Sequence, residues 1–206
     1  LGDVYKRQTQ MGGFSTDQMA ALTSTQLVAI ETGDLRGFTG AQFSALNTEA
    51  IAGLTTAQTA ALSSTHLAAL TTTQVQAFET ADLQALTTAQ IRSLTTGSLA
   101  ALTTDQMVAL ETADLRALTL TQLAALGTAQ LNALGTAQVA AMTVAQVAGL
   151  TTAQVAGLST DNLNALTTTQ FAVLTAAQAA VLTTDQMAAL ATDEIAANAG
   201  IDCEHQ

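Results

Sequence analysis

Large apolar residues recur along the chain at a fixed interval of eight. If Phe14 is assigned to position one of an octad, that position holds a large apolar residue in every octad up to the one that begins at Leu190 and ends at Ala197. A second apolar row starts at position six, with Met19, and it is weakened only at Thr59 and Ala179. The eight-residue repeat is therefore the organising unit of the sequence.

The other positions of the octad are small or polar. Position eight is nearly always Ala or Gly, and Val173 and Val181 are its bulkiest members. Position three is nearly always Thr or Ser, position five is usually Gln, and positions four and seven vary and carry most of the charge. We expect positions one and six to form the core and positions four and seven to face solvent.

The period argues against two regular conformations, a long continuous helix and a β-solenoid. An α-helix advances about 100° per residue, so each octad would leave the apolar row about 80° out of phase. A long helix would then have no stable buried stripe. In a strand, positions one and six would point to opposite faces because their parity differs. The abundance of Ala and Gln also favours helix over strand.

A short helix that restarts in every octad fits the pattern. Segments such as residues 55–58, Thr-Thr-Ala-Gln, match the capping box, in which a hydroxyl caps the helix and a Gln follows three residues later. Either Thr of the pair could be the cap. A helix this short is not stable alone in water, so its neighbours must hold it.

Three octads carry Glu-Thr-x-Asp in place of Thr-Thr-x-Gln. Because Glu precedes the Thr, we expect the Thr to be the cap there: Thr32, Thr80 and Thr112. The following Asp34, Asp82 and Asp114 then lie in the first helical turn, where the helix dipole favours negative charge.

These features predict an all-α solenoid of short capped helices, one per eight-residue repeat. The small residue at position eight should let neighbouring helices approach closely. Handedness and the number of octads per turn do not follow from the pattern. The Glu-Thr-x-Asp octads begin at Ile30, Phe78 and Leu110, so six octads separate the first two and four separate the last two. Both gaps are even numbers of octads, which hints at two octads per turn.

The repeat divides the chain into three segments. Residues 1–8 depart from it, since Lys6 occupies a position-one site, and they resemble translated sequencing-adapter sequence at the ends of metagenomic reading frames. A natural N-terminal flank is the alternative. Residues 9–197 form the expected solenoid. Residues 198–206, in which Asn198 breaks the position-one rule, are expected to be a tail or a cap.

Composition and charge argue against several classes of binding partner. Apolar residues make up 49% of the chain, so a core can form, whereas the net charge of −11 argues against nucleic acid and anionic membrane surfaces. Thr and Gln interrupt every octad, and no long uninterrupted apolar stretch exists, so we expect no membrane insertion.

No residue pattern points to catalysis, a cofactor or a metal ion. The serines fill ordinary repeat positions, and Cys203 and His205 are only two potential ligands near the chain end. His66 stands where Gln usually stands, which indicates a polar substitute rather than a ligand. The position-four acids and the position-seven arginines are expected on the surface; they include Asp17, Asp105, Asp161, Asp185, Arg36, Arg92 and Arg116. The sequence therefore predicts that the protein is not an enzyme.

The repeat resembles a known type of array. Segments such as residues 150–158, Leu-Thr-Thr-Ala-Gln-Val-Ala-Gly-Leu, are similar to octapeptide tracts in very large bacterial secreted or surface proteins, often labelled adhesins or haem-utilisation proteins. The resemblance covers residues 9–197. The sequence gives no support to haem binding, because it contains no His or Tyr pair that could ligate iron.

The resemblance implies an extracellular or cell-surface location and a role as a structural spacer or stalk. The alternative is a repeat-based binding module for a protein, a glycan or an ice surface. Such a module would use a regular ladder of position-three Thr or position-five Gln. If Thr caps each helix and Gln closes the box, both residues are instead used internally.

Overall fold

The computed structural model describes residues 10–190, and every regular element in that range is a short α-helix. Their bounds are α2 (Thr16–Ala20), α3 (Ser24–Val28), α4 (Thr32–Leu35), α5 (Gly40–Ala45), α6 (Thr48–Ala52), α7 (Thr56–Ala60), α8 (Ser64–Ala69), α9 (Thr72–Gln76), α10 (Thr80–Ala85), α11 (Thr88–Ser93), α12 (Thr96–Ala100), α13 (Thr104–Ala109), α14 (Thr112–Ala117), α15 (Leu120–Ala124), α16 (Thr128–Ala133), α17 (Thr136–Ala141), α18 (Val144–Ala148), α19 (Thr152–Gly157), α20 (Thr160–Asn164), α21 (Thr168–Phe171) and α22 (Ala176–Ala179). Residues 184–190 are also helical. One helix per octad confirms the prediction of an all-α solenoid.

Each helix begins after a capping residue at position two. In α19, Thr151 is extended (φ −72°, ψ 156°), and its hydroxyl accepts a hydrogen bond from the backbone N–H of Gln154. The Gln154 side chain accepts the Thr151 N–H in return. The chain then leaves the helix through an extended Leu158 at position one (φ −64°, ψ 140°). No described residue has a positive φ. The chain therefore passes from one helix to the next through extended residues at positions one and two, and not through a left-handed glycine.

The expected caps of the Glu-Thr-x-Asp octads are wrong by one residue. Thr32, Thr80 and Thr112 are the first helical residues, and the capping positions hold Glu31, Glu79 and Glu111, none of which forms a side-chain cap hydrogen bond. The repeat geometry places the break at position two, whichever residue stands there. The Asp residues do lie in the first turn, as expected.

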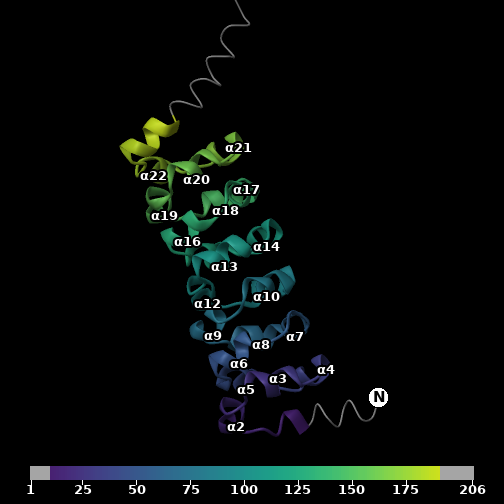
Figure 1. Cartoon of the computed structure of the whole chain (residues 1–206). Coiled ribbons are helices and arrows are strands. Elements are labelled where there is room, and N and C mark those ends of the chain that lie inside the picture. The colour runs from purple at the N-terminus through teal and green to yellow at the C-terminus, as the bar shows by residue number, and fades with distance from the viewer. Residues whose placement is uncertain (1–9, 191–206) are drawn as a thin grey trace, which may run out of the picture.

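The helices stack in successive turns along one axis (Figure 1). Their contacts sort them into three columns. Each helix makes its main contacts with the helices three before and three after it, as in α5 with α8 or α16 with α19. A superhelical turn therefore takes about three octads, and the hint of two octads per turn is wrong. Of the Glu-Thr-x-Asp octads, those of α4 and α10 share a column through α7, whereas α14 belongs to another column.

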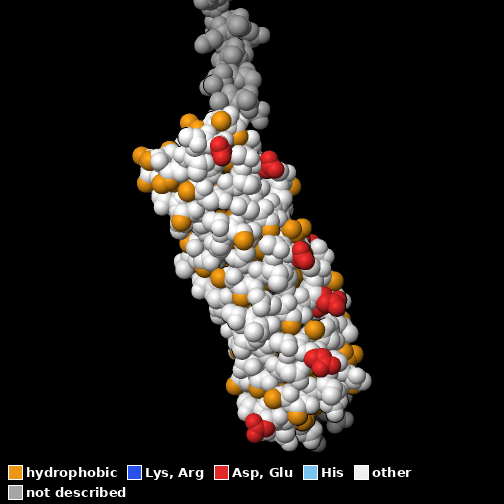
Figure 2. Space-filling model, turned by 60° about the vertical axis from the view of Figure 1, so that its left-hand side comes forward, with side chains coloured by type: hydrophobic (Ala, Val, Ile, Leu, Met, Phe, Trp, Pro, Cys, Tyr) orange, Lys and Arg blue, Asp and Glu red, His pale blue; other side chains and the backbone are white. Residues whose placement is uncertain are grey.

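The core is continuous along the axis. Position-six side chains such as Leu67 and Val155 are fully buried, and position-one side chains such as Leu70 and Leu134 are 3–4% exposed. The buried rows join into one cluster that runs from Met19 to Leu190. The space-filling view shows acidic side chains spread along one face and apolar side chains scattered between them (Figure 2).

Small residues lie where successive turns approach most closely. A Cβ on Gly157, at position eight, would lie well inside van der Waals contact with the Thr128 side chain, and one on Gly53 would approach Ser24 just as closely. In both pairs position eight contacts position three of the turn below. Close approach at position eight is thus a contact between turns, not between consecutive helices of the chain.

Two predicted segments lie outside the described residues. These are the leader, residues 1–8, and the tail, residues 198–206, with Cys203 and His205. The described range, residues 10–190, lies within the predicted solenoid, residues 9–197.

Candidate functional site

The buried glutamine at position five is the most regular polar feature between the turns. The Gln154 side-chain oxygen accepts the Thr151 N–H at 2.9 Å, and its Nε2 donates to the carbonyls of Leu123 and Leu126 at 2.9 and 2.8 Å. One amide therefore closes the cap of its own helix and satisfies two carbonyl groups of the turn below. We call this arrangement the glutamine bridge.

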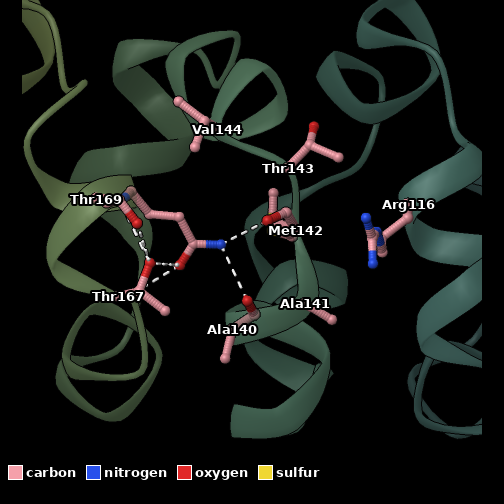
Figure 3. Close-up of a pocket in the computed structure, with 9 residues that line it drawn as sticks. Arg116, Ala140, Ala141, Met142, Thr143, Val144, Thr167 and Thr169 are labelled. Atoms are coloured by element: carbon pink, nitrogen blue, oxygen red, sulfur yellow. Dashed lines mark hydrogen bonds between the residues drawn. The ribbon is translucent and has the colours of Figure 1, made fainter.

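The bridge recurs along the array, and in each case the Nε2 donates to carbonyls of the turn below. It is formed by Gln42, Gln58, Gln74, Gln90, Gln106, Gln122, Gln130, Gln138, Gln146, Gln154, Gln170, Gln178 and Gln186. Gln18 and Gln26, in the first described turn, are exposed, and among the described residues their side chains make only the cap. Figure 3 shows the bridge of Gln170 reaching the carbonyls of Ala140 and Met142.

Sequence reasoning found the cap but missed the contact between turns. A capping box accepts Glu as readily as Gln. The two carbonyls below require a donor, and Gln154 is only 4% exposed, so a carboxylate there would bury an unpaired charge against two oxygens. The sequence feature that could have indicated this contact is the use of Gln rather than Glu at position five of the Thr-capped octads.

His66 replaces the glutamine in one octad and makes equivalent contacts. Its Nδ1 accepts the Ser63 N–H at 3.3 Å, and its Nε2 lies 2.7 Å from the Phe38 carbonyl oxygen. Because a carbonyl only accepts, the proton must lie on Nε2. The ring also stacks on Phe43, with centroids 4.3 Å apart. Burial lowers the pKa of His66, while the bond to Phe38 acts in the opposite direction.

A different donor serves the octad of α6, where position five is Ala50. Asn47, the capping residue, donates from Nδ2 to the carbonyls of Ala20 and Leu22 at 3.0 and 2.9 Å. Leu22 stands at position one of the turn below, the place to which a glutamine bridge from position five would donate. The link between turns is thus retained although the glutamine is not.

The aspartates at position five cannot donate as carboxylates. Asp34, Asp82 and Asp114 are buried, with 5, 2 and 5% exposure. Burial raises the pKa of Asp114, and the neighbouring Glu111 carboxylate raises it further, whereas the Glu111 N–H lowers it. These octads keep the helix but lack the amide that joins the turns.

A family model for the ALTTAQ repeat matches residues 27–64, 75–111, 107–144, 139–168 and 160–192. Together these ranges cover more than half of the chain. The chain belongs to the ALTTAQ repeat family. No curated protein and no solved structure matches it. The six letters stand as residues 85–90, which run from the end of α10 through the core Leu86 and the capping Thr87 to the bridging Gln90.

The ALTTAQ octads leave one row of hydroxyl groups unused. Position-two threonines and position-five glutamines are occupied by the caps and the bridges. The internal use of Gln is thus confirmed, whereas the internal use of the position-three Thr is wrong, because the cap lies at position two. Position-three threonines such as Thr56, Thr72 and Thr152 are exposed and form no side-chain hydrogen bond with the described residues. A ladder for an external ligand would have to use this row.

A shallow groove of about 420 Å³ opens between α14, α17, α18 and α21 (Figure 3). Its lining includes Arg116, Met142, Val144 and Thr169. Elsewhere in the ALTTAQ array, the position-seven Arg36 donates to the Ala61 carbonyl of the next turn at 3.4 Å. The arginines thus lie on the surface, as expected, and Arg116 adds a positive charge to this groove.

The described residues contain no group of three or more His, Cys, Asp or Glu side chains that could hold a metal ion. The position-four acids Asp17, Asp105, Asp161 and Asp185 are exposed. Within residues 10–190, none of the helices has the length and apolar character needed to cross a bilayer.

Proposed function

We propose that this ALTTAQ array is a structural spacer in an extracellular or cell-surface bacterial protein. It would hold flanking parts of that protein at a fixed distance and carry out no catalysis. The glutamine bridge carries the proposal, because it links each turn to the one below at nearly every octad. Together with the continuous core, it supports a rod whose length grows with the number of octads.

Solution X-ray scattering of length variants tests the spacer geometry. Duplication of residues 127–150, which are three octads, should add one turn and lengthen the particle without changing its cross-section. A second duplication should add the same increment. Increments that differ, or a cross-section that widens, would contradict a rod built from equivalent turns.

A surface-exchange variant tests the function itself. The residues at positions four and seven would be exchanged among the octads at constant composition, with the caps and bridges left intact. In the parent protein, a spacer should still work after the exchange and fail only when the number of octads changes. Loss of function at constant length would favour a binding surface.

The second candidate is a binding module for a protein, a glycan or an ice surface. The observation that favours it is the position-three row, whose hydroxyls are exposed and take no part in capping. Thermal hysteresis or glycan-array binding should disappear after Thr-to-Val changes at position three and persist after the same change at the exposed position-four residues Thr25, Thr65 and Thr121. That result would support this candidate over the inert spacer.

A further inference from the structure

Two departures from the octad meet between α7 and α10. Thr59 is the one polar residue in the position-six core row, and Asp82 stands at position five of the α10 octad in place of a bridging Gln. The two side chains are 0 and 2% exposed, and their helices pack directly against each other. The fold thus brings a hydroxyl and a carboxyl together inside the core.

Two buried polar atoms at this point form no hydrogen bond with the described residues. Thr59 Oγ1 and Asp82 Oδ2 are buried without a hydrogen-bond partner. The Leu54 carbonyl, at position one of the turn below, is where a glutamine bridge from position 82 would donate. It accepts no hydrogen bond from the described residues. Buried acceptors left in this way are costly, because they have lost water and gained nothing.

Asn162 shows what a side chain of this length does at position five. Its Nδ2 donates to the Leu131 carbonyl of the turn below at 2.8 Å. The equivalent carbonyl for Asp82 is that of Ile51. Asp and Asn have the same shape, so a carboxylate oxygen would face this carbonyl oxygen with no hydrogen between them. A protonated carboxyl would place its O–H where the Asn amide donates.

We propose that Asp82 is a proton-binding group that replaces the amide donor between α7 and α10. In acid, the carboxylate takes up a proton from water. The resulting O–H group then donates a hydrogen bond to the Ile51 or Leu54 carbonyl. When the proton returns to water, the carboxylate can no longer donate to either carbonyl, and the contact between the two turns weakens.

Burial and the nearby negative charge both favour the protonated form of Asp82. Burial raises the pKa of Asp82 and the Glu79 carboxylate raises it further, whereas the Glu79 N–H and the nearby Thr59 hydroxyl lower it. On the packed helices, α7 has no titratable side chain, and α13 brings Asp105, which is exposed. No basic side chain lies on α7, α10 or α13 to stabilise the charged form.

The sign follows from proton binding in the two states. The folded state binds the Asp82 proton more tightly than the unfolded chain does, because its pKa is raised above the ordinary value of 3.8. Stability from this contact is therefore complete below that ordinary value and is lost as the pH rises through the raised pKa.

The experiment combines a direct titration with local hydrogen exchange on the full chain. Carboxyl ¹³C signals should give Asp82 a midpoint above the ordinary value of 3.8. Amide protection in α7 and α10, corrected for intrinsic exchange, should be lower at pH 7 than at pH 4, because the raised pKa keeps more of the contact protonated in acid. Asp82→Asn should keep this protection at both pH values, and Asp105→Asn should behave like the wild type.

A second variant keeps the proposal testable if Asp82→Asn folds poorly. Thr59→Val removes the hydroxyl that lowers the pKa, so it should move the Asp82 midpoint upward. An Asp82 midpoint at or below 3.8, or equal protection at both pH values in the wild type, would overturn the proposal. Stabilisation of the wild type by Na⁺ or Ca²⁺ at pH 7, absent in Asp82→Asn, would overturn it in favour of a cation site.

Discussion

Asn47 Oδ1 accepts the backbone N–H of Ala50 at 2.8 Å, and the Asn47 Nδ2 donates to two carbonyls of the turn below. One side chain at position two thus performs the two tasks that other octads divide between a Thr and a Gln. Because Asn47 takes over the donation, position five can be an alanine.

This relationship predicts strong coupling between the two positions. Asn47→Thr alone should destabilise the array by about 1–3 kcal/mol, because Leu22 loses its donor while Ala50 cannot supply one. Adding Ala50→Gln should restore most of the stability by creating a standard octad. A double-mutant cycle in urea measures the coupling, and additive effects would contradict it.

The bridge itself is tested at Gln154. Gln154→Glu should cost more than Gln154→Leu, because the charge would be buried against the Leu123 and Leu126 carbonyls. We expect at least about 2 kcal/mol for the Glu variant at neutral pH. Gln26→Glu is the matched control, because Gln26 is exposed and, within the described part of the chain, makes only the cap. Equal losses at both sites, measured by denaturant unfolding, would show that the cap alone explains the glutamine.

The capping assignment is tested within one Thr pair. Thr151→Ala should cost about 1 kcal/mol, since its hydroxyl accepts the Gln154 N–H at 3.1 Å. Thr152→Ala should change stability by less than about 0.5 kcal/mol, because Thr152 is exposed and its hydroxyl is unused. The reverse order in thermal unfolding would move the cap to position three.

Two glycines should respond to alanine with opposite signs. Gly157→Ala would press a methyl group against Thr128 Cγ2, so it should destabilise by about 1–3 kcal/mol. Thr128→Ala in the same chain should recover part of this loss. Gly97→Ala, in α12, meets nothing closer than 3.8 Å and should stabilise by about 0.5–1 kcal/mol. Calorimetry of the three variants decides whether the close approach between turns governs position eight.

His66 should make stability depend on pH. Burial lowers its pKa from 6.5, so the unfolded chain binds this proton more tightly than the folded one. Its contribution is complete above pH 6.5 and is lost as the pH falls below that value. His66→Gln should remove this part of the pH dependence, because Gln can form the bridge without titrating. Identical pH profiles for the two proteins would contradict the effect.

The sequence was sufficient for the local structure. An eight-residue spacing cannot keep one face of a long helix buried, so the register of Phe14, Leu22 and the following position-one residues predicted a break in every octad. The Thr-Thr-x-Gln segment supplied the cap, and the apolar rows supplied the core. These features depend on contacts within a few residues, which a sequence pattern records directly.

The tertiary structure alone decided what joins the turns. The number of octads per turn depends on how consecutive helices are oriented, and every octad looks alike whether two or three complete a turn. Three features follow from that number. They are the contact of Gln154 with the turn below, the donation by Asn47 in place of a glutamine at position 50, and the proximity of Thr59 to Asp82. Each links groups that are distant in the sequence, and such a contact appears only once the chain is wound into a superhelix.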